Sequence, residues 1–182
     1  QKFPELKNHI HLGDVLKIDL TTIFPSGDFA IIGNFPYNIS SQILFKTLEN
    51  RVRIPFFCGM FQKEVALRIC GNPGNKTYGI LSVLSQVYYE TNYLFDVPPN
   101  VFSPPPKVNS GVIALRRKEN LVIDFDEKLL FRVVKTGFQQ RRKTLRNSLK
   151  SLDIPKTILE DSIFDLRPER LSSDQFIELT KL

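Results

Sequence analysis

The sequence predicts an α/β protein in which a sheet with an antiparallel ending is followed by a small all-helical C-terminal region. Three observations support this prediction. Continuous apolar runs, typical of buried parallel strands, occur at residues 29–33 and 54–61, and a helical pattern follows each of them. Two strand-like segments then follow one another near the middle of the chain. After residue 119, strand signals vanish and only helical patterns remain.

The N-terminal segment is predicted to contain a short strand. Residues 9–12 (HIHL) alternate in polarity and end at Gly13-Asp14, a typical turn pair. His9 and His11 would share one face of that strand. A metal site there is disfavoured, because no third ligand lies nearby in the sequence.

The first buried strand leads into a predicted helix. Residues 29–33 (FAIIG) form the strand, and residues 42–50 (QILFKTLEN) form the helix. Ser40 and Ser41 precede this helix and are suitable N-caps, since a serine hydroxyl can accept from a free N–H group of the first turn.

The middle of the chain repeats the alternation of strand and helix. The strand at residues 54–61 (IPFFCGMF) is followed by a helix over QKEVALRIC. The segment GNPGNKTYG is rich in glycine and also contains a proline, and is predicted to be a loop. ILSVLSQVYYE is then predicted to pack as a second helix.

The two late strands lie on either side of a proline-rich stretch, SPPPKV. They are contained in residues 92–102 (NYLFDVPPNVF) and 110–118 (SGVIALRRK). The helical remainder is expected to end in short helices, the last of which is capped by Ser172 or Ser173. The predicted domains are residues 1–118, which contain the sheet, and residues 119–182, which are helical.

Composition narrows the class of protein. The 182 residues carry a net charge of +6, which favours a polyanionic partner. No apolar run approaches the roughly 20 residues of a membrane span.

Cys58 and Cys70 lie in apolar settings without a CxxC pattern, so we expect free thiols and no zinc site. The start, QKFPELKNHI, lacks both the apolar stretch of a signal peptide and an initiator Met, which indicates a fragment or a processed chain.

A candidate binding pocket follows the first buried strand, at Asn34-Phe35-Pro36-Tyr37. In open α/β sheets, ligands bind beyond the carboxyl ends of the strands. Pro36 has a fixed φ and no N–H, and it disfavours helical geometry at Phe35, so the chain turns stiffly here. The alternative is a purely structural turn that happens to contain a proline.

These four residues suit a flat base with an exocyclic amine. The lone pair of such an amine is delocalised into the ring, so the nitrogen is a poor nucleophile. Two acceptors that grip its N–H groups would favour a tetrahedral nitrogen and free the lone pair. Asn34 offers a side-chain carbonyl, the backbone near Phe35 and Pro36 offers another, and Tyr37 can stack on the base. Alignment with an electrophile would supply much of the rate.

This tetrapeptide resembles the N-(L/I)-P-Y motif of the ribosomal RNA adenine dimethyltransferases of the KsgA type, with Phe35 in place of the usual Leu or Ile. The resemblance covers essentially the whole chain, and five blocks occur in family order, which is far more specific than one motif. The blocks are GNFPYNISSQILFKTL, FQKEVALRI, YGILSVLSQ, VFSPPPKVNSGVIAL and FQQRRKTLRNSLK.

The resemblance implies a fold, a reaction and roles for individual residues. The fold is a Rossmann-like class I methyltransferase sheet followed by a small all-α domain that binds rRNA. S-adenosyl-L-methionine would donate two methyl groups to each of two adjacent adenines near the 3′ end of small-subunit (16S) rRNA. Asn34 and the Pro36 carbonyl would hold the target amine, and Tyr37 and Phe102 would stack on the flipped base. The Asp14 carboxylate and Asn34 would contact the cofactor. The alternative reading of Phe102 is an ordinary core residue, and that of Asp14 a turn residue.

Part of the family pattern is missing from these 182 residues. The glycine-rich cofactor loop and the acidic residue that binds the ribose hydroxyls are both absent, so the first βα units of the sheet are missing. We therefore expect this chain to bind the cofactor weakly or not at all, and the activity to belong to the parent protein. The resemblance also implies a cytoplasmic monomer that acts on the 30S precursor.

A basic stripe is predicted along one long helix, RVVKTGFQQRRKTLRNSLK, in which Gly137 is a possible kink. An apolar stripe beside it, containing Val134 and Leu145, would dock the helix. We expect the basic stripe to contact rRNA phosphates, and the alternative is a solvated face. The predicted rRNA-binding residues are Lys107, Arg132, Lys135, Arg141, Arg142, Lys143, Arg146 and Lys150; Arg116 and Arg117 extend the stripe.

Three other functions compete with a small-subunit dimethyltransferase. A non-catalytic ribosome assembly factor could keep the fold for docking on rRNA. A related resistance methyltransferase would act on large-subunit rRNA, but FQQRRKTLRNSLK resembles the small-subunit branch. A DNA adenine methyltransferase would more often carry D-P-P-Y, with a carboxylate at position 34.

Overall fold

Four strands form one mixed sheet in the order β1-β2-β4-β3. The computed structural model describes residues 3–119 and 121–182. β1 and β2 are parallel, and β4 runs antiparallel to both β2 and β3. The predicted α/β sheet with an antiparallel ending is therefore confirmed. The strands are β1 (Ile31–Asn34), β2 (Phe56–Gln62), β3 (Tyr89–Val97) and β4 (Ser110–Arg117).

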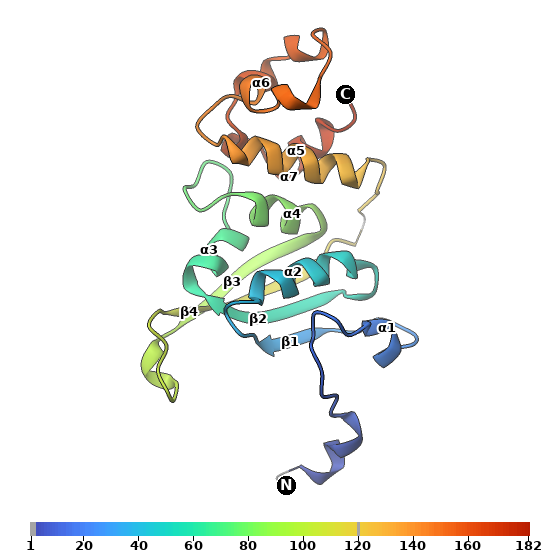
Figure 1. Cartoon of the computed structure of the whole chain (residues 1–182), viewed down its shortest axis with the longest axis vertical. Coiled ribbons are helices and arrows are strands. Elements are labelled where there is room, and N and C mark those ends of the chain that lie inside the picture. Colours follow the sequence, from blue (N-terminus) through green and yellow to red (C-terminus); the bar gives the residue numbers. More distant parts are fainter. Residues whose placement is uncertain (1–2, 120) are drawn as a thin grey trace.

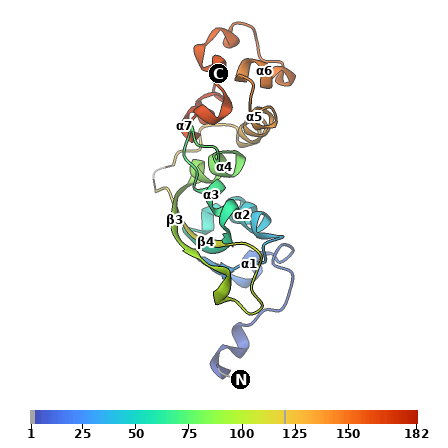
Figure 2. The same cartoon turned by 90° about the vertical axis from the view of Figure 1, so that its left-hand side faces the viewer.

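Seven α-helices occur among the described residues: α1 (Leu20–Ile23), α2 (Ser40–Glu49), α3 (Lys63–Ile69), α4 (Ile80–Tyr88), α5 (Glu127–Gln139), α6 (Leu145–Ser148) and α7 (Ser173–Glu178). Helices α2, α3 and α4 lie on the same side of the sheet, and α5 to α7 are stacked beyond α4 (Figures 1 and 2). Short 3₁₀ segments connect many of these elements. No described helix is long and apolar enough to cross a membrane.

The covered face of the sheet is apolar, as period-two alternation requires. In β2, Phe57, Gly59 and Phe61 are buried and alternate with half-buried residues of the opposite face. That opposite face carries exposed apolar side chains, of which Ile32 is 75% exposed. The site described below lies at one end of this sheet.

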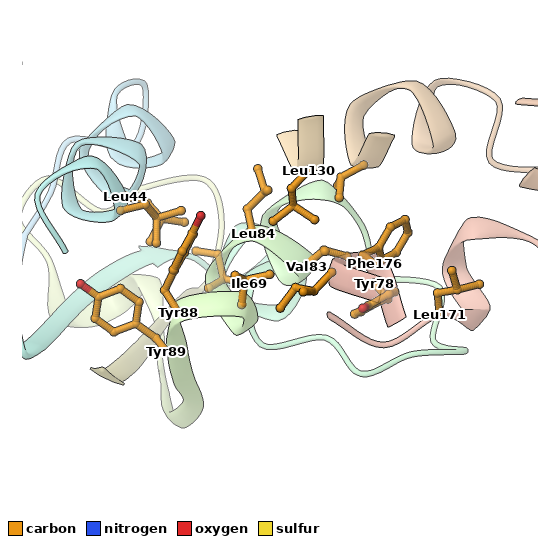
Figure 3. Packing of buried hydrophobic residues seen from close by; sticks show 14 of the residues in the cluster. Leu44, Ile69, Tyr78, Val83, Leu84, Tyr88, Tyr89, Leu130, Leu171 and Phe176 are labelled. Carbon is orange, nitrogen blue, oxygen red and sulfur yellow. The ribbon is translucent and has the colours of Figure 1, made fainter. Parts of the chain in front are cut away.

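The hydrophobic core continues from the sheet into the C-terminal helices. Leu84 of α4 lies near Leu130 of α5, and Tyr78 lies near Phe176 of α7 (Figure 3). The predicted division into residues 1–118 and 119–182 stays a prediction, and Asn120, beside that boundary, lies outside the described residues. The buried cluster is continuous across both parts.

A polar contact also joins the two parts. Glu127, at the start of α5, accepts hydrogen bonds from Arg51 Nη2 at 2.6 Å and from the Tyr88 hydroxyl. The Arg51 guanidinium lies 4.3 Å from the centre of the Tyr88 ring. Burial, together with Glu127, raises the pKa of Tyr88 well above its ordinary value, so this hydroxyl stays protonated and donates.

Three local predictions are wrong. Residues 9–12 are not a strand: a 3₁₀ helix covers Pro4–His9, and residues 10–12 have no regular structure, because no strand pairs with them. Ser40 and Ser41 do not cap α2, whose N-cap is Ile39. The helix predicted over residues 132–150 is broken, since α5 ends at Gln139 and α6 begins at Leu145.

The break between α5 and α6 allows α6 to fold back and pack on α5. Leu145 and Leu149 are thereby buried against Gly137, where an added Cβ would lie 3.5 Å from Leu145 and from Pro168.

The predicted N-cap of the last helix is confirmed. Ser172 is the N-cap of α7, and its hydroxyl accepts from the backbone N–H of Gln175 at 3.2 Å.

Both cysteines are free and half-buried. Burial raises the pKa of the Cys70 thiol to about 11, so this group stays neutral near pH 7. Among the described residues, no group of three or more His, Cys, Asp or Glu side chains is placed to hold a metal ion.

Candidate functional site

The end of β1 opens onto a cavity of about 460 Å³. Strand β1 ends at Asn34, and the five residues 35–39 form the connection to α2, which begins at Ser40. The other wall comes from the connection between β3 and β4, far along the chain from the first wall. The lining residues are Asn34, Phe35, Pro36, Tyr37, Phe102, Pro104, Pro105 and Pro106.

Phe35 anchors the turn to the sheet. Its ring lies over two glycines that are paired neighbours in β1 and β2, Gly33 and Gly59. It stacks on Phe57 with ring centres 5.5 Å apart, and meets Phe61 edge to face at 5.9 Å. The glycines leave room for an aromatic side chain at the position where the family motif usually has Leu or Ile.

Asn34 is exposed and lines the cavity, so its amide does not point into the packed interior. The Pro36 carbonyl accepts a hydrogen bond from the Ile39 N–H at 3.1 Å. A carbonyl oxygen has two lone pairs, so one remains for a ligand. The cavity is therefore lined by two residues that carry acceptor oxygens, Asn34 and Pro36, together with aromatic residues.

Tyr37 is tied to two buried serines. Its hydroxyl lies 2.5 Å from the Ser110 Oγ, and its backbone carbonyl accepts from the Ser40 Oγ at 3.0 Å. Neither contact was predicted from the sequence. Ser40 was predicted only as a helix N-cap, and Ser110 is 73 residues from Tyr37, so no local pattern could have revealed its contact.

The opposite wall is a stiff connection that carries Phe102. Consecutive prolines restrict its backbone, and its base is held by Lys63. The Lys63 ammonium lies 2.5 Å from the Asp96 carboxylate, and the Lys63 N–H donates to the Asn109 carbonyl at 2.9 Å. Asp96 also accepts from the Tyr93 hydroxyl; burial and this bond raise the pKa of Tyr93 to about 12.

Asp14 lies in a separate exposed turn and is not among the residues that line this cavity. Its carboxylate accepts from the Leu16 N–H at 2.9 Å, and its other oxygen lies 3.8 Å from the Lys17 ammonium. The turn is attached to α2, because Lys46 donates to the backbone carbonyls of Leu16, at 3.1 Å, and Ile18.

The structure divides the predicted rRNA-binding residues into two groups. Arg141 donates to the carbonyls of Lys76 and Asn75, at 2.7 and 3.0 Å, and so fastens the turn after α5. Arg146 donates two hydrogen bonds to Asp165 at 2.9 and 3.0 Å, and a third to a backbone carbonyl. The second group, whose residues are all exposed, consists of Lys107, Arg132, Lys135, Arg142, Lys143 and Lys150.

Lys107 is set apart from the rest of that second group. It lies in the connection between β3 and β4, which projects from the end of the molecule opposite α5 and α6 (Figure 1). Arg117 is also engaged, donating to the backbone carbonyls of Arg51 and Val52, so it supports the fold. The predicted stripe is thus interrupted by cations that have structural partners.

Comparison with known families shows to which family the chain belongs. The model of the family described as ribosomal RNA adenine dimethylase matches residues 2–172. The chain belongs to this family. Its Rossmann-like methyltransferase sheet and its enzyme class follow from that membership, as the resemblance predicted.

Relatives named ribosomal RNA small subunit methyltransferase A align with nearly the whole chain. The protein of Flavobacterium johnsoniae is 60% identical over 179 residues, which are 98% of this chain and 69% of that protein. The protein of Cytophaga hutchinsonii is 55% identical over 180 residues, which are 99% of this chain and 69% of that protein.

Solved structures agree on the fold of this rRNA adenine dimethylase chain. A dimethyladenosine transferase from Plasmodium falciparum superimposes with a TM-score of 0.80 at 26% identity, covering 93% of this chain and 70% of that one. The 23S rRNA methyltransferase ErmE superimposes with a TM-score of 0.69 at 22% identity, covering 99% of this chain and 76% of that one. The latter shows likeness of fold alone.

Proposed function

We propose that the protein carrying this chain transfers two methyl groups to the N6 amine of each of two adjacent adenines near the 3′ end of small-subunit rRNA. The observation that carries the proposal is that Asn34, Pro36, Tyr37 and Phe102 line one cavity. Family membership supports rRNA adenine as the substrate. The protein acts as a cytoplasmic monomer on the 30S precursor.

The target base enters the cavity after it leaves its stack. Tyr37 and Phe102 hold its faces, a contribution of about 1–3 kcal/mol for a stacked base. The Asn34 side-chain oxygen and the second lone pair of the Pro36 oxygen accept the two N6 hydrogens. The nitrogen then becomes more tetrahedral, and its lone pair points away from the ring. The N6 proton leaves after attack, so no strong base is required.

The second transfer starts from an amine with a single N–H. One of the two acceptors, Asn34 or Pro36, then has no hydrogen to accept, and the cavity must also admit the first methyl group. The base is therefore held less by hydrogen bonds and more by Tyr37 and Phe102.

S-adenosyl-L-methionine, when bound, supplies an electrophilic methyl group on a sulfonium. The residues present fit part of this molecule. The Asp14 carboxylate is exposed and can accept a hydrogen bond from the adenine amine of the cofactor. Asn34 lines the cavity that the methyl group would have to reach. The glycine-rich loop that lets a cofactor approach the backbone is not part of these 182 residues.

We predict that these 182 residues bind S-adenosyl-L-methionine weakly and are inactive alone. Calorimetric titration of the cofactor into this chain should give no binding at micromolar concentrations, while the full-length protein binds. Micromolar affinity for the isolated chain would contradict the prediction, and Asp14→Asn in the full-length protein would show whether that carboxylate contributes.

The exposed cations of the C-terminal part are proposed to contact rRNA phosphates. Replacing Arg132 or Lys143 by Ala should weaken binding of small-subunit rRNA and lower the slope of log K against log salt by about 1 for each phosphate that the protein no longer contacts. The melting temperature should not change, because both side chains are exposed. Fluorescence anisotropy over a salt series measures the slope.

The matched comparison is Arg146→Ala, which removes an equal charge. This variant should instead lower the melting temperature, because the Asp165 Oδ1 atom loses both hydrogen bonds that Arg146 donates to it and the Leu159 carbonyl loses a third. Lys156→Ala, at an exposed position outside the predicted stripe, serves as the control for charge alone. Equal salt slopes for wild type, Arg132→Ala and Lys143→Ala would refute the assignment.

The direct test of the reaction is methylation of unmethylated small subunits by the full-length protein. The expected product is N6,N6-dimethyladenosine, identified by mass spectrometry of nucleosides, with primer extension stopping at two adjacent adenines. The competing proposal, a non-catalytic assembly factor, predicts binding without this product.

A further inference from the structure

Tyr37 is fixed at both ends by hydroxyl groups from the protein interior. Ser110, which is 0% exposed, lies 2.5 Å from its phenol oxygen, and Ser40, which is 1% exposed, donates to its backbone carbonyl. Backbone atoms of a turn are commonly held by serines. A bond to the far end of the ring is different, because it fixes the position of the phenol oxygen and therefore the direction of the long axis of the ring.

Ser110 occupies the position where the two walls of the cavity meet. It is the first residue of β4 and is paired with Gln62 of β2 and Val97 of β3. The connection that carries Phe102 ends at Ser110. A single buried hydroxyl therefore links the ring of one wall to the base of the other, and fixes how the two walls face each other.

The engagement of the Tyr37 hydroxyl also limits its chemistry. Because it is bonded to Ser110, it does not have to be solvated or to reach the substrate. The ring then serves as a flat surface of fixed orientation. Stacking depends on the relative placement of the two rings, so a tyrosine whose long axis can swing away from the cavity holds a base less well.

We propose that Ser110 is a positioning residue that orients Tyr37 for stacking on the target adenine and so sets the efficiency of the second methyl transfer. This inference rests on the proposed function. The first transfer has two hydrogen bonds and a stacked base, whereas the second has one hydrogen bond fewer. Loosening the ring should therefore slow the second transfer more than the first.

The test compares Ser110→Ala, Tyr37→Phe and the double variant in the full-length protein. Unmethylated small subunits are methylated in a single turnover, and the ratio of N6-methyl- to N6,N6-dimethyladenosine is followed by mass spectrometry. Ser110→Ala should slow the second transfer relative to the first by about 3- to 10-fold, the usual value of one hydrogen bond, so that monomethyladenosine accumulates. Tyr37→Phe should do the same, and the double variant should be no worse than either single one.

Ser85→Ala is the matched control. Ser85 is equally buried, and its hydroxyl has no hydrogen-bond partner among the described residues, so its removal should leave the product ratio unchanged. If Ser110→Ala lowers the melting temperature sharply, Tyr37→Phe still removes the same bond from the tyrosine side.

Two results would overturn the inference. One is a wild-type product ratio in both single variants. The other is an effect of Ser110→Ala that persists fully in the Tyr37→Phe background, since Ser110 would then act by another route. A wild-type enzyme that makes no dimethyladenosine at all would overturn the proposed function itself, and this inference with it.

Discussion

Asn34→Ala should reduce adenine methylation by about 10²–10³-fold or more, the typical loss when one preorganised polar group is removed from a reacting centre. Asn34 is the only side chain with an amide or carboxylate oxygen among the residues that line the cavity in the described part of the chain. Without it, one N6 hydrogen has no acceptor, and the lone pair stays delocalised. Because Asn34 is exposed, its truncation should not change the melting temperature.

The same variant separates the two remaining functions. Methylation is measured on unmethylated small subunits, and rRNA binding by anisotropy on the same preparation. An enzyme loses methylation and retains binding, whereas a pure assembly factor retains its effect on assembly. Asn100→Ala, an exposed amide in the connection after β3, is the control and should behave as wild type. Full activity of Asn34→Ala would disprove the role given to this amide.

Gly59→Ala should destabilise the protein and inactivate it. An added Cβ at Gly59 would overlap the Phe35 ring, and one at Gly33 would come within 2.5 Å of it. The ring cannot yield easily, because Phe57 and Phe61 pack against it. Overpacking of this kind costs about 1–3 kcal/mol. Displacing Phe35 also moves its chain neighbours Asn34 and Pro36, and an error of about 1 Å at a reacting centre can cost about 10²-fold in rate.

The decisive test is whether a second substitution restores the stability and activity that Gly59→Ala removes. Phe35→Leu removes the ring that the methyl group added by Gly59→Ala would meet, so the double variant should regain stability and activity over Gly59→Ala alone. Thermal unfolding and methylation are measured on wild type, Gly59→Ala, Phe35→Leu and the double variant. Gly79→Ala, where an added Cβ meets no atom within 4 Å, should have a far smaller effect. A double variant as impaired as Gly59→Ala would show that some contact other than the Phe35 ring is responsible.

The strands and the pocket could be predicted because their signals are local. The apolar runs at residues 29–33 and 54–61 correspond to β1 and β2, and the motif lies at the carboxyl end of β1. The catalytic roles of its residues stay predictions, but the structure does place Asn34, Tyr37 and Phe102 around one cavity. The strand predicted at residues 9–12 does not form, because alternating polarity does not provide the second strand with which it would have to pair.

The sequence by itself determined the fold class and the residue types that lie at the end of β1, since both depend on residues that are close together along the chain. Only the tertiary structure decided which cations have structural partners and what holds the pocket in shape. Arg146 is bound to Asp165, and Tyr37 is bound to Ser110, 73 residues away. Packing between segments that are distant in the sequence determines these partners. Neither helical spacing nor the pattern of charge along the chain can therefore predict them.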